Sequence, residues 1–341
     1  MTIAATTTKP NLPTPFPWFG GKSRVASIVW DRFGDVKNYV EPFFGSGAVL
    51  LGRPSDPKIE TINDADGFVC NFWRAVQTDP EKVAHYCDWP VNENDLTARH
   101  IWLANQRETL TDRLCGDPDF FDPKIAGWWC WGLCAWIGGS WCSGDGPWES
   151  DGGLLVKKSR KAGVSRQVPH LSSNGQGVHR KRPHLGNNGQ GVHRKLPHLN
   201  DNGRGVLDWF IALSSRLRRV RVCCGDWSRV VKPVVTTHHG LTGVFLDPPY
   251  AVEHRDDVYR IDSKEIAHSV REWAIANGDN PQLRIALCGY EGEHTMPDSW
   301  DCVAWKCHGG MSNQRRNGVN NNKYLERIWF SPHCLKDSSL C

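Results

Sequence analysis

The sequence predicts an α/β fold built on an open sheet, and three segments carry this prediction. Each is a short strand-like run that ends in an acidic residue at a turn: residues 38–41 end in Glu41, residues 60–64 in Asp64 and residues 244–247 in Asp247. Such runs bounded by turn signals are typical of buried strands. In open α/β sheets, ligands bind outside the carboxyl ends of the strands. We therefore expect these acids at the edge of the sheet that carries the site.

The most informative segment is Asp247-Pro248-Pro249-Tyr250. The apolar residues before it indicate a buried strand, which stops because neither proline can donate a backbone N–H. Asp247 and the Pro248 carbonyl can accept the hydrogens of a flat, amine-bearing ring on which Tyr250 stacks. The alternative is a proline-rich turn with a surface tyrosine. These four residues are our candidate catalytic segment.

A glycine turn near the N-terminus is a candidate ligand-binding loop. Gly20 and Gly21 lie between Trp18 and Lys22, and glycines let the backbone approach a ligand closely. Lys22 opens a segment, 25–33, whose apolar periodicity predicts a helix. A lysine in such a place often serves only solubility. Beside a tryptophan it can instead meet a ligand carboxylate, with Trp18 covering an apolar part of the ligand.

A second glycine turn follows a strand that breaks at Pro42 and leads into an apolar helix. In nucleotide-binding α/β domains, backbone N–H groups at the start of this helix face the ligand. Gly45 and Gly47 lack the third glycine of a dinucleotide fingerprint, which argues against a phosphate clamp. Glu41 at the end of the strand also disfavours phosphate. A neutral or positively charged ligand fits better.

Two further acids are candidate nucleoside contacts. Asp64 ends the second predicted strand, about 20 residues after the glycine turn, where an acid suits the two hydroxyls of a ribose. Its alternative role is to cap the next helix, which Asp66 can do instead. Asp226-Trp227 ends a strand predicted over 220–224 and suits the edge and face of an adenine.

Composition is that of a large globular protein. The 341 residues can form one large domain or two ordinary ones. Thirteen cysteines are an odd number, which favours free thiols in a reducing compartment over a disulfide framework. No pair has Cys-x-x-Cys spacing, and we expect no metal. Residues 1–15 lack the apolar run of a signal peptide, and we expect no membrane span.

The net charge of +4 divides into a basic insert and an acidic body. Residues 157–205 hold eleven Lys or Arg and one acid, and the rest of the chain holds 30 Lys or Arg and 36 acids. A basic block of this kind is typical of a polyanion-binding insert. Within it, residues 169–206 repeat with a period of 14, and each unit contains Asn-Gly, a strong turn signal.

The repeats leave three interpretations open: ordered loops that contact nucleic acid, a flexible basic loop and, less favoured, a histidine-rich metal site. Tryptophans between residues 127 and 148 are expected mostly in the core, with an exposed few able to stack on bases. The candidate nucleic-acid-binding residues are Arg166, Arg180, Lys181, Arg182, Arg194, Lys195 and Arg204.

Together, these motifs resemble the Dam-type DNA adenine-N6 methyltransferases of the alpha motif order, in which the catalytic tetrapeptide follows the target-recognition region. The middle of the chain, 91–205, matches weakly, and Cys288-Gly289-Tyr290 stands where the family has Ser-Asn. The stretches that match the family in its order are 18–22, 41–47, 63–64, 247–250 and 323–329.

The resemblance implies a Rossmann-like, S-adenosylmethionine-dependent methyltransferase sheet. Residues 1–90 and 206–341 would form the catalytic domain, and 91–205 the inserted target-recognition region. Lys22 would face the carboxylate of S-adenosylmethionine, Asp64 its ribose, and Asp226-Trp227 its adenine. The implied cofactor-binding residues are Trp18, Gly21, Lys22, Glu41, Pro42, Phe43, Gly45, Gly47, Asp64, Asp226, Trp227 and Asp247.

The implied reaction is site-specific transfer of a methyl group from S-adenosylmethionine to N6 of adenine in double-stranded DNA, with the target base flipped out of the helix. Cytosine-N4 methylation and a catalytically silent DNA-binding protein on the same scaffold are the alternatives. We expect a monomer that acts on DNA in the cytoplasm of a bacterial or phage-infected cell, within a restriction-modification system or as an orphan enzyme.

Overall fold

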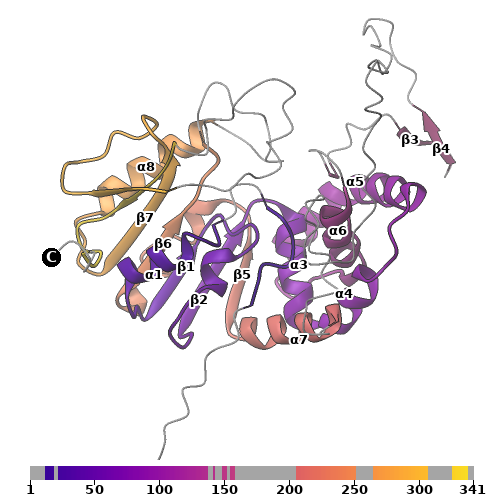
Figure 1. Cartoon of the computed structure of the whole chain (residues 1–341), viewed down its shortest axis with the longest axis horizontal. Coiled ribbons are helices and arrows are strands. Elements are labelled where there is room, and N and C mark those ends of the chain that lie inside the picture. The colour runs from indigo at the N-terminus through magenta and orange to yellow at the C-terminus, as the bar shows by residue number, and fades with distance from the viewer. Residues whose placement is uncertain are drawn as a thin grey trace, which may run out of the picture.

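The computed structural model describes residues 12–18, 22–136, 141–142, 148–151, 154–157, 205–250, 264–305 and 325–336. Its centre is a seven-stranded sheet, which occupies the left half of Figure 1, while a group of helices occupies the right half. The strands of the sheet are β1 (Asn38–Glu41), β2 (Ile59–Asp64), β5 (Val220–Cys224), β6 (Thr242–Leu246), β7 (Leu283–Tyr290), β8 (Asp301–Ala304) and β9 (Glu326–Phe330).

The helices are α1 (Ala26–Phe33), α2 (Ala48–Leu51), α3 (Gly67–Thr78), α4 (Pro80–Cys87), α5 (Glu93–Gly116), α6 (Pro123–Ala135), α7 (Val206–Leu217) and α8 (Lys264–Asn277). Two short 3-10 helices are η1 (Trp227–Arg229) and η2 (Thr237–His239). A separate two-stranded antiparallel hairpin pairs β3 (Trp148–Asp151) with β4 (Leu154–Lys157).

The strand order of the sheet is β5-β2-β1-β6-β7-β9-β8. The first five strands are parallel, β9 is antiparallel to both its neighbours, and Val40 of β1 pairs with Thr61 of β2 and Val244 of β6. This arrangement confirms the expected Rossmann-like sheet. The chain order reverses between β1 and β6, and in doubly wound sheets ligands bind outside the carboxyl ends of the strands at this switch point.

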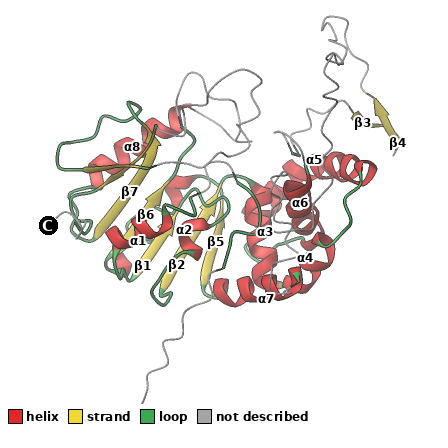
Figure 2. Cartoon of the chain, viewed as in Figure 1, coloured by secondary structure: helices red, strands yellow, loops and turns green. Residues whose placement is uncertain are grey.

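Each face of the sheet has its own hydrophobic core because successive side chains of a strand point to opposite faces. Val244 and Leu246 of β6 pack with Val270 of α8, whereas Phe245 packs on the opposite face with the cluster that includes Trp30 of α1. In Figure 2, α1 and α2 accordingly cover one face of the sheet and α8 the other. This double cover explains why β6 is buried along its whole length.

Helices α3 to α7 form a block beside β5 whose aromatic core continues that of the sheet. Side chains of Asp66, Asp79, Asn92 and Asp122 cap the N-termini of α3, α4, α5 and α6 by accepting a backbone N–H, which satisfies donors that a helix start leaves open. The expectation that most tryptophans of 127–148 are core residues is confirmed for Trp129, Trp131 and Trp141.

Gly132 of α6 is predicted to tolerate no side chain. A Cβ at this position would lie 1.8 Å from the ring of Trp141, which is buried. We expect Gly132→Ala to lower the free energy of unfolding by about 1–3 kcal/mol, because overpacking forces the ring or the helix to shift. Urea denaturation measures this loss. The matched control is Gly116→Ala at the end of α5, where nothing lies within 4 Å; equal midpoints for the two variants would contradict the prediction.

The elements that the sequence patterns predict are present: α1, β1, α2, β2, α3, β5 and β6 lie where those patterns place them. The closing strand, expected from residue 323, is described from Glu326. Residues 169–204 of the 14-residue repeats and the seven candidate basic residues lie outside the described residues, as does Gly21. The proposed division at residues 91 and 205 stays a prediction.

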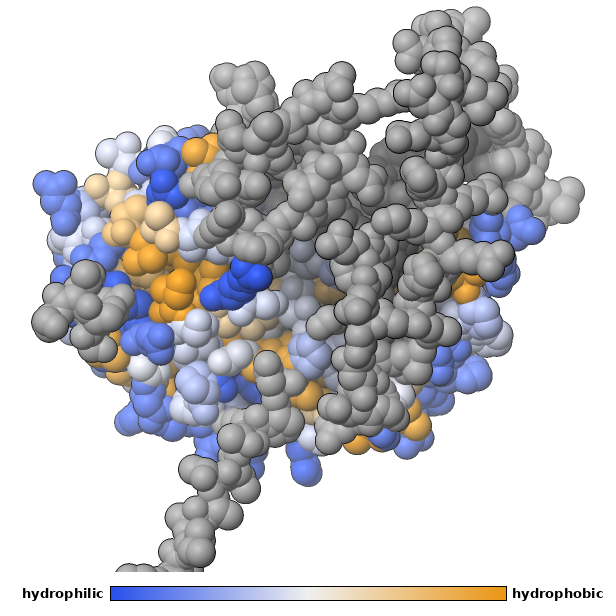
Figure 3. All heavy atoms as spheres, viewed as in Figure 1, coloured by the Kyte–Doolittle hydropathy of each residue, from blue (hydrophilic) through white to orange (hydrophobic). Residues whose placement is uncertain are grey.

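The surface offers little further guidance to function. In the view of Figure 3, hydrophilic residues follow the margin of the described surface and apolar residues gather between them. Large apolar side chains that are exposed come from several separate elements: Ile59, Trp89, Val91, Leu207, Ile211, Val234 and Leu335. Of the described helices, none combines the length and apolar character of a membrane span. All eleven cysteines in the described part of the chain are free.

Candidate active site

The predicted site residues converge at the carboxyl edge of the sheet, on both sides of the switch point. Glu41 is the last residue of β1, and Asp247 follows the last residue of β6. Asp64 ends β2, and the glycine turn of residues 45–47 leads from β1 into α2. Because these strands are parallel, their carboxyl ends lie at one edge and bring the three acids together.

A compact hydrogen-bond cluster joins the N-terminal Lys22 motif to the distant Asp247–Tyr250 motif. The Lys22 ammonium lies 3.0 Å from Oδ1 of Asp247 and donates a hydrogen bond of 3.0 Å to the Tyr250 hydroxyl. The same hydroxyl lies 3.2 Å from Oδ1 of Asp247. The side chain of Lys22 is 6% exposed and that of Asp247 is 14% exposed, so this ion pair is largely removed from water.

The contacts of Asp247 with other described residues use one of its two carboxylate oxygens. Within the described part of the chain, its contacts with Lys22 and Tyr250 both involve Oδ1. A carboxylate has two oxygens and about four acceptor sites. Oδ2 can therefore accept the hydrogens of an amine, as the sequence predicts for this residue.

Two residues that the sequence analysis assigned no role complete the cluster. Glu326, the first residue of β9, accepts a hydrogen bond of 2.9 Å from the Tyr250 hydroxyl at Oε2. Tyr290, the last residue of β7, is the sheet partner of Glu326, and its ring meets that of Tyr250 edge-on at 4.6 Å. Tyr290 belongs to the segment 288–290 that stands where the family has Ser-Asn, and its ring packs against the side of Tyr250.

Two aromatic side chains lie beside the Lys22 ammonium. Tyr250 contacts it through the hydroxyl at the edge of its ring, and the ring centroid of Trp305 lies 5.4 Å from Nζ, a distance at which a cation is attracted to an aromatic ring. Trp305 is buried, and its backbone N–H donates to the carbonyl of Glu326. The residues before β9 therefore connect directly to the N-terminal motif.

Glu41 is a buried acid beside this cluster. It is 2% exposed, and its Oε2 accepts a hydrogen bond of 2.7 Å from the Tyr39 hydroxyl. Burial raises the pKa of Glu41 well above its usual range, the Tyr39 hydrogen bond opposes that rise, and the charge of Asp247 adds to it. A cationic ligand beside Glu41 would favour its ionised form.

Asp64 holds the glycine turn in place. Its Oδ2 accepts the N–H of Gly45 at 3.0 Å and its Oδ1 accepts the N–H of Asp66 at 2.9 Å. Burial raises the pKa of Asp64 to about 6, although both backbone hydrogen bonds lower it. Asp66 caps α3 through the N–H of Phe68, so the helix cap falls to Asp66 as predicted.

The two glycines of the turn are required by backbone geometry and by close packing. Gly45 and Gly47 have φ values of 49° and 71°, which favour glycine. A Cβ on Gly45 would lie 2.3 Å from the Trp18 indole. Trp18, which the sequence places near the ligand, therefore packs directly on the turn between β1 and α2.

The predicted adenine contacts lie beyond β5. Trp227 stacks on Phe43 with ring centroids 6.2 Å apart, so the residues after β5 and β1 do meet. Asp226 Oδ1 accepts the N–H of Ser228 and caps η1. Neither contact tests the predicted role in adenine binding, which stays a prediction for both residues.

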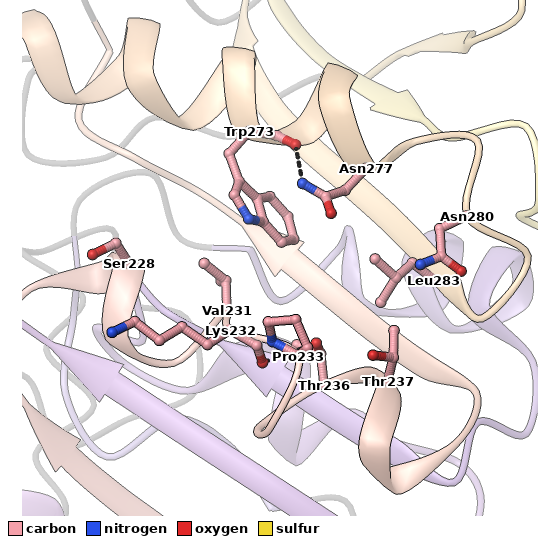
Figure 4. A pocket seen from close by; sticks show the side chains of 10 residues that line it. All are labelled: Ser228, Val231, Lys232, Pro233, Thr236, Thr237, Trp273, Asn277, Asn280 and Leu283. Carbon is pink, nitrogen blue, oxygen red and sulfur yellow. Dashed lines mark hydrogen bonds between the residues drawn. The ribbon is translucent and has the colours of Figure 1, made fainter.

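A pocket of about 250 Å³ lies apart from this cluster. Trp273 of α8 and the segment between η1 and η2 line much of it, and Figure 4 shows the Trp273 ring facing Val231 and Pro233. No carboxylate lines the pocket among the described residues. Its lining residues are Ser228, Val231, Lys232, Pro233, Thr236, Thr237, Trp273, Asn277, Asn280 and Leu283.

The geometry unites the motifs on which the family resemblance depends, and a comparison with known families supports it. Residues 18–112 match the family model of the D12 class N6 adenine-specific DNA methyltransferases. This stretch contains Trp18, Lys22, Glu41, the glycine turn and Asp64. The predicted resemblance is thus confirmed for residues 18–112, while Asp247 to Tyr250 lie outside the matched residues.

Two curated relatives point the same way. DNA adenine methylases from two strains of Vibrio cholerae serotype O1 are each 26% identical to this chain over 98 residues. The match covers 28% of this chain and 35% of each relative. The similarity therefore spans about a third of the relatives' length.

The sequence contained a signal for Glu326 that the motif analysis did not use. Glu326 is an acid at the start of the closing strand, whose last three residues are apolar. Its role depends on β9 pairing with β7 in antiparallel register, which brings the start of β9 to the carboxyl edge of the parallel strands. A reversed strand beside β7 is not visible in the residue pattern. This explains why the sequence marked the segment but not the residue.

Proposed function

We propose that this chain is a site-specific DNA methyltransferase that transfers a methyl group from S-adenosylmethionine to N6 of adenine in double-stranded DNA. The observation that supports this most is the Lys22–Asp247–Tyr250 cluster at the switch point of the sheet. This cluster joins Lys22, which lies within the residues that match the D12 family model, to the distant Asp247–Tyr250 segment, which is suited to binding an amine.

The residues at the carboxyl edge fit a cationic nucleoside cofactor. Glu41, Asp64 and Asp247 are acids on three adjacent strands, which favours a ligand with a sulfonium and an ammonium group over a phosphate. Asp64 would bind the ribose of S-adenosylmethionine, and Glu41 would bind its amino group. Trp227 and Phe43 would contact its adenine. The contact between Lys22 and the cofactor carboxylate stays a prediction. When bound, S-adenosylmethionine would supply the methyl group.

Asp247 is assigned to the target amine. The exocyclic amine of adenine is a weak nucleophile because its lone pair is delocalised into the ring. Hydrogen bonds from the amine to Oδ2 of Asp247 and to the Pro248 carbonyl would favour a tetrahedral nitrogen with a directed lone pair. The Lys22 ammonium pairs with the other oxygen of this carboxylate, Oδ1, at 3.0 Å. Positioning and fixed charges of this kind supply much of the acceleration in many enzymes.

The target base must leave the duplex to reach this site. Flipping costs about a few kcal/mol, which phosphate contacts can offset in part. The basic residues of the insert, 157–205, are the proposed phosphate contacts. This assignment depends on sequence alone, because all of these basic residues except Lys157, which ends β4, lie outside the described part of the chain.

Nucleoside mass spectrometry of DNA incubated with the protein and S-adenosylmethionine tests the proposed function. N6-methyladenine is the expected product. Formation of N4-methylcytosine instead would show that the target is the amine of cytosine. If a calorimetric titration with S-adenosylmethionine shows no binding, the protein is a catalytically silent DNA-binding protein.

The affinity for S-adenosylmethionine is expected to fall as the pH is lowered through about 6. The pKa of Asp64 is raised to about 6, and only the ionised carboxylate accepts both ribose hydroxyls beside its two backbone N–H groups. The loss approaches about tenfold per pH unit below that value. Calorimetry at several pH values measures it.

Two variants isolate Asp64 in this experiment. Asp64→Asn is expected to bind more weakly but with little pH dependence between about 5 and 7. Asp66→Asn retains the cap of α3 and should keep the wild-type dependence, since Asn caps helices as well as Asp. If the affinity of Asp64→Asn for S-adenosylmethionine depends on pH as that of the wild type does, a group other than Asp64 is responsible for the pH dependence.

A further inference from the structure

The hydroxyl of Tyr250 has one hydrogen and two carboxylates within reach. Oε2 of Glu326 lies at 2.9 Å and Oδ1 of Asp247 at 3.2 Å. Lys22 already donates a hydrogen bond to the hydroxyl oxygen. A phenolic O–H donates once, so it serves one carboxylate at a time. The carboxylate that takes this hydrogen determines how strongly the other can accept a substrate hydrogen.

We propose that Glu326 is a positioning residue for the methyl-transfer reaction: it takes the hydrogen of Tyr250 and so leaves Asp247 a full acceptor for the target amine. This inference builds on the proposed function, and it adds a residue that neither the matched stretch nor the tetrapeptide contains. The shorter distance to Glu326 favours this arrangement whenever Glu326 is ionised.

Protonation of Glu326 reverses the arrangement. The neutral acid becomes a donor to the Tyr250 oxygen, which then accepts from Glu326 and Lys22. The phenolic hydrogen turns to Oδ1 of Asp247. Asp247 is then held by two donors, and its carboxylate becomes a weaker acceptor for the amine. A change in the charge of Glu326, which begins β9, therefore alters how well Asp247, which follows β6, accepts a hydrogen bond.

The surroundings of Glu326 cause it to gain its proton at a higher pH than an ordinary glutamate does. Glu326 is 4% exposed, and burial raises its pKa; Lys22 opposes the rise, and Asp247 adds to it. The charged and titratable groups around it are Lys22, Asp247, Tyr250, Glu293, Cys288 and Arg327. A raised pKa means that the acid gains its proton at a higher pH than usual. Methyl transfer should therefore decline as the pH falls through that raised value.

Single-turnover methyl transfer at saturating cofactor and DNA, from about pH 5 to 9, tests the proposal. Saturation removes the effect of Asp64 on cofactor affinity. The wild type is expected to lose activity on the acid side. Glu326→Gln, which keeps an acceptor oxygen, and Tyr250→Phe, which keeps the ring, should each move that acid limb to lower pH. The double variant should move it no further than either single variant.

Glu291→Gln is the matched control. Glu291 follows β7, its side chain is 59% exposed, and it pairs with Arg327 beside Glu326. Its loss should leave the acid limb in place. An acid limb that stays at the wild-type pH in both Glu326→Gln and Tyr250→Phe would overturn the proposal.

A second measurement keeps the proposal testable where a variant is too slow to assay. Carboxyl ¹³C resonances of glutamate-labelled protein report the titration of Glu326, which is assigned by its absence in Glu326→Gln. The expected midpoint coincides with that of the wild-type acid limb. A midpoint near the ordinary value of about 4.3 would overturn the proposal. A wild type without N6-methyladenine product at any pH would instead refute the proposed function.

Discussion

Asp247→Ala is expected to lower the rate of methyl transfer by at least about 10³-fold, a loss typical of removing a preorganised group that contacts the reacting atoms. The variant loses the carboxylate whose Oδ2 would hold the target amine, while Lys22 keeps its hydrogen bond to Tyr250. Transfer of a labelled methyl group from S-adenosylmethionine to DNA measures the rate.

The fold should survive this substitution. Asp247 lies after β6, and its side chain is 14% exposed, so its removal opens no cavity in either core. The buried Lys22 loses its ion partner, which costs about 1–3 kcal/mol of stability. Circular dichroism and cofactor calorimetry should show a folded protein that still binds S-adenosylmethionine.

Asp247→Asn is the matched control because it retains an acceptor oxygen without the charge. Its rate should lie between those of the wild type and Asp247→Ala. Full transfer by Asp247→Ala would remove this residue from the mechanism, and equal loss in both variants would show that charge, rather than hydrogen bonding, is what matters.

Deletion of residues 169–204 is expected to weaken DNA binding by at least about 100-fold at low salt. The segment contains six of the eleven basic residues of the insert, and each phosphate contact contributes about 0.9 to the slope of log affinity against log salt. The slope should therefore fall by up to about five. Fluorescence anisotropy with a DNA duplex at several salt concentrations measures both quantities.

The boundaries of this deletion follow from the structure. Val206 begins α7 and is 1% exposed, and Gly205 precedes it at the helix start, so the deletion ends at residue 204. A full-length control with all six basic residues changed to glutamine separates charge from length. Cofactor affinity should not change in either variant. DNA affinity equal to that of the wild type in both would assign the insert a role other than DNA binding.

The fold was largely predictable because local patterns mark each strand end of the parallel sheet. Pro42, Asp64 and the Asp247-Pro248-Pro249 run each end a strand, and the helices after β1 and β2 follow directly. Helix α8 and strand β8 were not predicted, although Ile266, Val270 and Trp273 have the spacing of an amphipathic helix. Their positions follow from the second core, where Val270 and Trp300 pack against β6 and β7.

The candidate site was predictable where each residue lies beside a turn of its own motif, as Asp64 and Gly45 do. Contacts between distant segments could not be predicted. The pairing of Lys22 with Asp247 joins residues more than two hundred positions apart. Glu326 reaches Tyr250 because β9 runs antiparallel to β7. Topology, rather than any short motif, produces these contacts.

A crystal structure of the protein with sinefungin, a stable analogue of S-adenosylmethionine, tests the central claim most directly. The account predicts that the analogue lies at the carboxyl ends of β1 and β6, with its amino end beside Glu41, its ribose on Asp64 and Oδ2 of Asp247 facing an open space for the target base. An analogue bound in the pocket beside Trp273, or with its ribose away from Asp64, would contradict it.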